Sequence, residues 1–79
     1  MTNVKLYTTE WCTWCQRVKE FFKQHKVNYT EYNVGEDEKA RDDMIKKSKQ
    51  TGVPVIDIDG KIVIGYDEAR LRELLKIKG

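Results

Sequence analysis

The chain has 79 residues, of which 39% are hydrophobic and 35% charged, and this length and composition predict one folded domain over residues 1–79. Its 15 basic and 13 acidic residues leave a net charge of only +2, which argues against a nucleic-acid-binding protein. No apolar run approaches the roughly 20 residues of a membrane span and no signal peptide is evident, so we expect a cytoplasmic protein with no membrane partner.

The first half of the chain alternates between two periodicities. Residues 3–8 alternate in polarity and predict a strand. After Cys12 the apolar residues follow a helical spacing, and we expect one buried stripe made of Trp14, Val18, Phe21 and Phe22. Residues 27–34 are rich in Val, Tyr and Thr and predict a second strand.

A second helix is expected between an acidic run at 36–38 and the lysines at 46, 47 and 49, because each charge favours its own end of the helix dipole. Its buried stripe would be Ala40, Met44 and Ile45. We expect the lysine cluster to be a solvated helix end.

The last third predicts a hairpin followed by a helix. Residues 55–58 and 61–64 read as strands, and Asp59-Gly60 between them is typical of a type I′ turn. Asp67 suits a helix N-cap, with Leu71, Leu74 and Leu75 on the inner face of the final helix.

The predicted order is β-α-β-α-β-β-α, an α/β fold. The first two strands should be parallel with a right-handed crossover, and the last two should form an antiparallel hairpin. We therefore expect a mixed four-stranded sheet flanked by three helices, with helices on both faces.

Cys12 and Cys15 form a C-x-x-C motif where the first strand ends and the first helix begins. This spacing places two sulfurs on the same side of one turn, within reach of a disulfide. The first sulfur would lie at the helix N-terminus, where unpaired N–H groups stabilise a thiolate, the nucleophile of thiol–disulfide exchange. The second lies one turn inside and suits the resolving role, so the pair predicts redox chemistry.

Metal binding and an inert pair are the alternatives. A structural zinc needs four ligands and this pair supplies two, while the only histidine, His25, lies too far along the helix. We therefore expect no metal site within one chain. An iron–sulfur cluster bridging two chains stays open, because thiolates are the right ligands for it. Two bulky indoles, Trp11 and Trp14, make a buried, purely structural pair less consistent with the sequence.

Pro54 is the only proline and precedes a predicted strand, a position where proline is ordinarily tolerated. If this turn faces the thiols, the backbone of Val53 is free to pair with an extended substrate. A cis bond before Pro54 is an economical way to build such a turn.

Five segments together resemble the glutaredoxins over nearly the whole chain: VKLYT at 4–8, CTWC at 12–15, MIKKS at 44–48, TGVPV at 51–55 and GYD at 65–67. The resemblance implies a thioredoxin fold, with Cys12 as nucleophile, Cys15 as resolving thiol and a cis peptide bond before Pro54. It also implies a glutathione groove. The residues expected to bind substrate are Trp14, Thr51, Val53, Pro54, Gly65, Tyr66 and Asp67.

The implied function is that of a dithiol oxidoreductase that reduces protein or glutathione mixed disulfides as a monomer. No cofactor is expected to be bound, and glutathione is the expected reducing co-substrate. Three positions depart from the family pattern. Thr13-Trp14 replaces Pro-Tyr, Thr9 replaces a frequent lysine, and Gly65-Tyr66 replaces a double glycine.

Two other functions remain open. A small redoxin of similar size takes electrons from thioredoxin reductase and donates them to ribonucleotide reductase, although its aromatic-rich motif before the last helix is not evident here. The other is the dimeric iron–sulfur carrier.

Overall fold

Seven elements follow one another in the order that the sequence predicts. The computed structural model describes residues 3–77. The elements are β1 (Val4–Thr8), α1 (Thr13–Gln24), β2 (Thr30–Asn33), α2 (Glu38–Ser48), β3 (Val55–Ile58), β4 (Lys61–Ile64) and α3 (Glu68–Leu75). None of the helices within residues 3–77 is long and apolar enough to cross a membrane.

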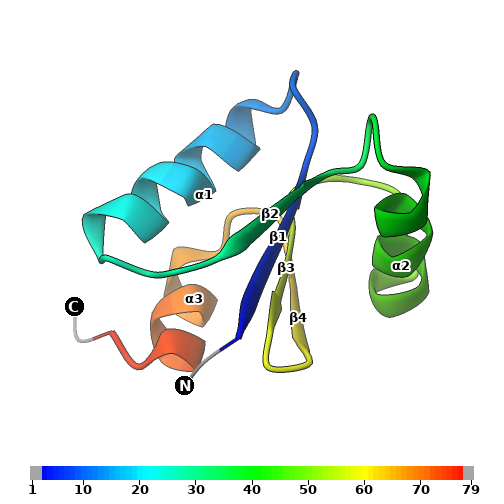
Figure 1. Cartoon of the computed structure of the whole chain (residues 1–79). Helices are drawn as coiled ribbons and strands as arrows, with labels where there is room; N and C mark the ends of the chain where they lie inside the picture. Colours follow the sequence, from blue (N-terminus) through cyan, green and yellow to red (C-terminus); the bar gives the residue numbers. More distant parts are fainter. Residues whose placement is uncertain (1–2, 78–79) are drawn as a thin grey trace.

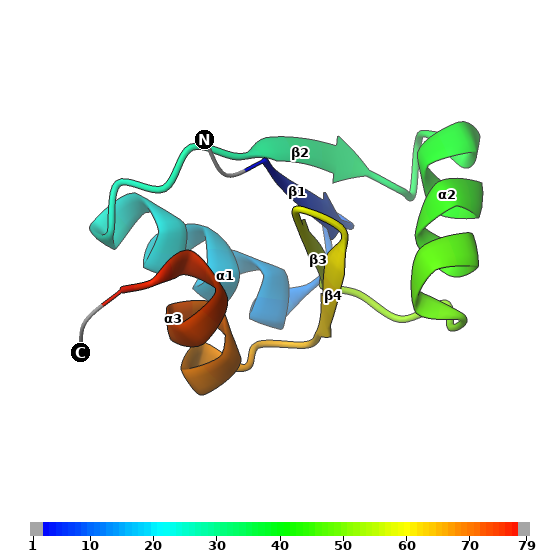
Figure 2. The same cartoon turned by 90° about the horizontal axis from the view of Figure 1, so that it is seen from below.

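The four strands form one mixed sheet in the order β2-β1-β3-β4. β1 and β2 are parallel, whereas β3 is antiparallel to both β1 and β4. Helices α1 and α3 cover one face of the sheet and α2 covers the other (Figures 1 and 2). The predicted thioredoxin fold is confirmed.

The core has two parts, one on each face of the sheet. Neighbouring residues of a strand point to opposite faces, so Leu6 packs under α1 and α3 while Tyr7 packs under α2. On the first face α1 contributes Val18, Phe21 and Phe22. On the second face α2 contributes Ala40 and Met44, as predicted, and Ile45 is half-buried there.

Each helix begins at a side chain that accepts a hydrogen bond from the backbone N–H three residues later. Asp37 accepts from Ala40 at the start of α2, and Asp67 accepts from Arg70 at the start of α3. Cys12 does the same for α1, with its sulfur as the acceptor. The predicted cap at Asp67 is confirmed.

The structure corrects two predicted elements. Trp14 does not belong to the buried stripe of α1, because its side chain is 56% exposed and the stripe begins at Cys15 instead. β2 covers residues 30–33 only, because Val27 and Tyr29 pack against the core without pairing to β1. The hairpin turn is confirmed, since Asp59 and Gly60 both have positive φ.

Candidate active site

The two cysteines lie at the start of α1, directly after the loop that follows β1. Cys12 is partly exposed and occupies the N-cap position, with extended backbone at φ −89° and ψ 108°. Its Sγ accepts a hydrogen bond of 3.1 Å from the backbone N–H of Cys15. The cap of α1 is therefore a sulfur that is both partly exposed and held by a backbone N–H.

Cys15 lies one turn further along α1 and is fully buried. Burial, followed by the hydrogen bond with Cys12, raises the pKa of the Cys15 thiol to about 12. Its thiol is therefore protonated at neutral pH and inaccessible to a large substrate. The structure thus gives the two sulfurs different environments, as the C-x-x-C spacing predicts.

The loop before β3 lies at the same end of the sheet as the thiol motif. β1 and β3 are antiparallel with Tyr7 opposite Val55, so the end of β1 faces the start of β3. The peptide bond between Val53 and Pro54 is cis, as predicted. Within residues 3–77, neither backbone polar group of Val53 has a hydrogen-bond partner, which leaves both groups available to a bound peptide.

Residues 65–67 connect β4 to α3. Gly65 has φ +77° and its N–H donates to the carbonyl of Pro54 at 2.9 Å, which ties this segment to the proline loop. The ring of Tyr66 stacks on Trp14 with centroids 6.3 Å apart. The structure therefore brings Trp14, Pro54, Gly65 and Tyr66 into one connected arrangement.

The structure connects two predicted site residues, Asp67 and Thr51, less closely to the other site residues. Asp67 is exposed, and one of its carboxylate oxygens already accepts the N–H of Arg70. Thr51 is exposed, and no side-chain hydrogen bond joins it to the other site residues within 3–77. Among the described residues, no group of three or more His, Cys, Asp or Glu side chains could hold a metal ion.

Sequence reasoning missed a hollow next to the loop that leads to Cys12. It has a volume of about 210 Å³ and is lined by Thr9, Glu10, Trp11, Asn33, Gly35 and Glu36. Trp11 is 89% exposed, the highest value among the large hydrophobic residues described. The sequence shows that an indole precedes Cys12. The closeness of this indole to residues 33–36 depends on the pairing of β1 with β2 and could not be read from the sequence.

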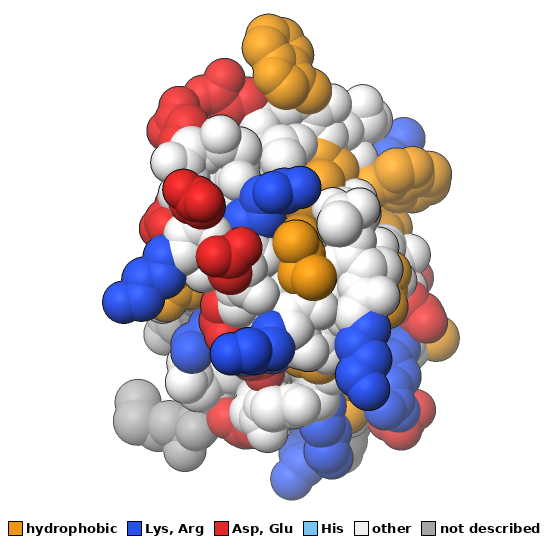
Figure 3. All heavy atoms as spheres, turned by 90° about the vertical axis from the view of Figure 1, so that its right-hand side faces the viewer, with side chains coloured by type: hydrophobic (Ala, Val, Ile, Leu, Met, Phe, Trp, Pro, Cys, Tyr) orange, Lys and Arg blue, Asp and Glu red, His pale blue; other side chains and the backbone are white. Residues whose placement is uncertain are grey.

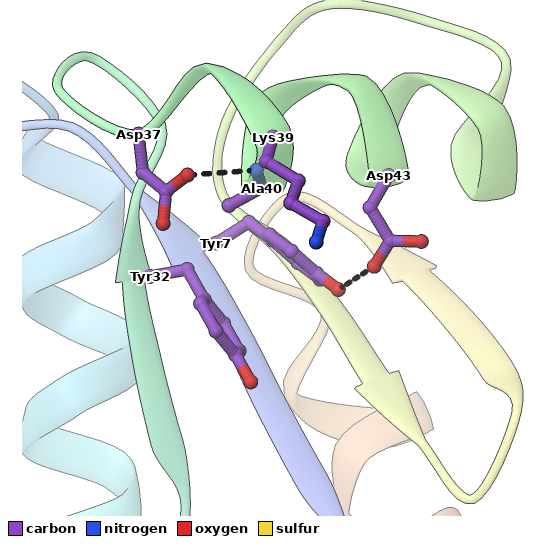
Figure 4. Close-up of a pocket in the computed structure, with 6 residues that line it drawn as sticks. All are labelled: Tyr7, Tyr32, Asp37, Lys39, Ala40 and Asp43. Carbon is purple, nitrogen blue, oxygen red and sulfur yellow. Dashed lines mark hydrogen bonds between the residues drawn. The ribbon is translucent and has the colours of Figure 1, made fainter.

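A second hollow of about 270 Å³ lies between the sheet and α2. Figure 4 shows Tyr7 and Tyr32 side by side there, with ring centroids 5.3 Å apart, and the Tyr7 hydroxyl donating to Asp43. None of the predicted site residues lines this hollow.

Next to Tyr7, Lys47 forms an ion pair with the buried carboxylate of Asp57 at 2.7 Å. The expectation of a solvated lysine cluster is therefore wrong for Lys47, although Lys46 and Lys49 are exposed. Burial opposes its charge, but hydrogen bonds with Asp57 and Tyr7 raise the pKa of Lys47 above its ordinary value. This pair joins α2 to β3, and both of its residues are far from the thiol motif along the chain.

A comparison with protein families gives a match to the glutaredoxin family over residues 4–63, most of the chain. The chain belongs to the glutaredoxin family. It is therefore a member of a family of thiol–disulfide oxidoreductases, and its C-x-x-C pair lies within the matched region.

Curated relatives agree with this assignment. The chain is 41% identical over 73 residues to an uncharacterized glutaredoxin-like 8.6 kDa protein in the rubredoxin operon of Clostridium pasteurianum, covering 92% of this chain and 97% of the relative. It is 37% identical over 68 residues to glutaredoxin 3 of Escherichia coli K12, covering 86% of this chain and 82% of the relative.

Solved structures share the fold. A crystal structure of a thioredoxin-like protein matches with a TM-score of 0.86 and 33% identity, covering 91% of this chain and 99% of that one. A crystal structure of a buckwheat glutaredoxin–glutathione complex matches with a TM-score of 0.73 over 91% of this chain and 68% of that one. Its sequence identity of 21% makes that second likeness one of fold alone.

Proposed function

We propose that this glutaredoxin-family protein is a dithiol oxidoreductase that reduces protein disulfides and glutathione mixed disulfides through Cys12 and Cys15. The observation that carries the proposal is the asymmetry of the two sulfurs. Cys12 is partly exposed and accepts a hydrogen bond from the Cys15 N–H, whereas Cys15 is fully buried with a raised pKa.

The reaction begins when the Cys12 thiolate attacks one sulfur of the substrate disulfide. A new S–S bond forms to Cys12, the substrate S–S bond breaks, and the departing thiolate takes up a proton from water. The Cys15 thiol then loses its proton and attacks the Cys12 sulfur, which releases the second substrate thiol. Two electrons have passed to the substrate, and a Cys12–Cys15 disulfide remains.

Burial of Cys15 sets the order of these steps. Its pKa of about 12 keeps Cys15 protonated at neutral pH, and charge on the neighbouring Cys12 is one of the causes that raise this pKa. Once Cys12 is part of a mixed disulfide, that neighbouring charge is gone, and deprotonation of Cys15 becomes less costly. The second attack therefore follows the first.

Glutathione is the reducing co-substrate of the proposal. Two glutathione thiols supply the two electrons that reopen the Cys12–Cys15 disulfide and become glutathione disulfide. The free backbone groups of Val53 suit an extended peptide. At the other end, Asp67 attracts the ammonium group of the γ-glutamyl residue, while the N-terminal N–H groups of α3 suit its carboxylate.

The test is a pair of coupled assays on the same disulfide substrate. One assay supplies glutathione with its reductase, and the other supplies thioredoxin reductase. We expect turnover with glutathione that disappears in Cys12→Ser. Turnover with thioredoxin reductase alone would assign the protein to the small redoxins that serve ribonucleotide reductase. A brown colour after purification without oxygen would instead support the iron–sulfur carrier.

A further inference from the structure

The hollow beside Cys12 lies between two loops that come from different parts of the chain. Thr9, Glu10 and Trp11 belong to the loop between β1 and α1, and Asn33 to Glu36 lead from β2 toward α2. The parallel register places Thr8 opposite Asn33, so both loops leave the sheet at the same end. A volume of about 210 Å³ is below the usual range of a cofactor site and suits one long side chain.

The ionisable groups that line this hollow are both carboxylates. Glu10 and Glu36 are exposed, and neither forms an ion pair within residues 3–77. The carboxylate of Asp37, the next residue along, is directed to the N–H of Ala40. Seen from the side of α2, acidic side chains gather toward the top beside an exposed hydrophobic side chain, and basic ones predominate lower down (Figure 3).

The indole of Trp11 adds a second attraction for a positive charge. It is 89% exposed and lines the same hollow. The face of an indole ring attracts a lysine ammonium or an arginine guanidinium, and its apolar surface packs against the methylene stem of either side chain. Trp11 directly precedes Cys12 in the chain, so the hollow adjoins the loop that leads to the thiol motif.

We propose that this hollow receives a lysine or arginine side chain next to the reacting cystine of a polypeptide substrate. The inference rests on the proposed function, because it names the class of disulfide that Cys12 attacks. The exchange is the one described above, with glutathione as the source of both electrons. The hollow positions the substrate, because Glu10, Glu36 and Trp11 hold its basic side chain while the sulfur reacts.

The charge of the whole chain cannot produce this preference. A net charge of +2 attracts acidic substrates at long range, whereas the hollow attracts basic ones at short range. A measured preference for basic peptides would therefore be due to the local carboxylates of Glu10 and Glu36. Glutathione, which carries two carboxylates, gains nothing from this hollow.

The experiment uses three disulfide peptides that differ at one position beside the cystine, which is lysine, glutamine or glutamate. The initial rate of reduction at low peptide concentration gives kcat/KM for each. For the wild type we expect the lysine peptide to react fastest and the glutamate peptide slowest. Glu10→Gln and Glu36→Gln should each reduce the rate for the lysine peptide roughly two- to fivefold.

Controls separate local from general effects. Glu20→Gln removes the same charge from an exposed position on α1 that has no ion pair within residues 3–77, and it should leave the order unchanged. Trp11→Ala should slow the lysine peptide more than the glutamate peptide, and Trp11→Phe should restore part of the loss. High salt should reduce the preference, because it screens exposed charges.

The outcomes distinguish the two proposals. Equal rates for the three wild-type peptides, or an unchanged order in the Glu10→Gln/Glu36→Gln double variant, overturn this inference and leave the proposed function standing. No reduction of any peptide by the wild type, with glutathione and its reductase present, overturns the proposed function and this inference with it.

Discussion

The indole of Trp14 stacks on the phenol ring of Tyr66, with an interplanar angle of 30° between the two rings. One ring lies in the first turn of α1 and the other in the segment before α3. The ring of Tyr66 also meets the ring of Phe21 edge-on, with ring centroids 6.1 Å apart. Tyr66 therefore connects the exposed Trp14 to the core. The contact links the thiol motif to the segment where we expect the γ-glutamyl end of glutathione to bind.

Loss of Trp14 should therefore change binding more than stability. We expect Trp14→Ala to raise the glutathione concentration needed for half-maximal rate, with a change in the free energy of unfolding of about 1 kcal/mol or less, since the side chain is largely exposed. Tyr66→Ala should also raise the half-maximal glutathione concentration, and it should lower the free energy of unfolding as well, because its half-buried ring contacts the core. Urea titrations beside the coupled assay measure the two quantities.

Replacing each cysteine by serine should have a different effect on thiol–disulfide exchange. Cys12→Ser should lose all exchange activity, because no other accessible thiol remains in the chain. Cys15→Ser should still form a mixed disulfide with a substrate and should accumulate it, since the resolving thiol is missing. Mass spectrometry after mixing with a disulfide peptide checks both outcomes. A mixed disulfide through Cys15 in the Cys12→Ser protein would contradict the assignment.

The Lys47–Asp57 pair gives a stability prediction. Lys47→Met leaves a buried carboxylate without its cation, and we expect a loss of about 2 kcal/mol in the free energy of unfolding. Lys46→Met, the matched control on an exposed position of the same helix, should change stability by less than about 0.5 kcal/mol. Urea unfolding at pH 7 measures both variants.

The ionisable groups around Lys47 predict how the free energy of unfolding changes at alkaline pH. Hydrogen bonds with Asp57 and Tyr7 outweigh burial and raise the pKa of Lys47 above 10.5, while burial and the Asp43 hydrogen bond raise that of Tyr7 above 10.0. A group whose pKa is higher in the folded than in the unfolded protein contributes its full stabilisation at a pH below its unfolded pKa. That stabilisation is lost as the pH rises through the folded pKa. The wild type should therefore lose stability above about pH 10, more steeply than Lys47→Met.

The glutathione groove can be tested by adding and removing charge. Thr9→Lys should lower the half-maximal glutathione concentration roughly tenfold, because a charge-assisted hydrogen bond to a carboxylate is restored. Thr30→Lys adds the same charge at an exposed position of β2 and serves as the control. Asp67→Ser should raise the concentration while keeping the cap of α3, since serine also caps helices. Steady-state kinetics with varied glutathione measure all three, and unchanged values for Thr9→Lys and Asp67→Ser would contradict the groove.

The sequence predicted what depends on local patterns: the element order, the hairpin turn and the cap at Asp67. The cis bond before Pro54 was instead expected from substrate pairing at Val53 and from the resemblance to the glutaredoxins. It misplaced Trp14, because helical spacing alone does not show that the first turn of α1 extends beyond the core. It missed the partnership of Lys47 with Asp57, since the two residues belong to different elements and meet only when α2 packs on the sheet.

The hollow beside Cys12 was missed for a similar reason. Trp11 and Glu36 are distant in the chain and line one hollow only because β1 and β2 are parallel and in a particular register. Strand pairing of this kind is a property of the whole sheet, whereas the thiol motif is a property of four consecutive residues. The thiol motif could therefore be recognised in the sequence, and the hollow next to it could not.

The three helix caps have one more consequence. α2 and α3 each begin at an aspartate, and in α1 the same position holds the sulfur of Cys12. An aspartate cap stays a carboxylate throughout, whereas in the proposed reaction the capping sulfur of α1 becomes part of a disulfide, where it is a weaker acceptor for the Cys15 N–H. In the proposed reaction, the N–H that loses part of this hydrogen bond belongs to Cys15, the residue that attacks next.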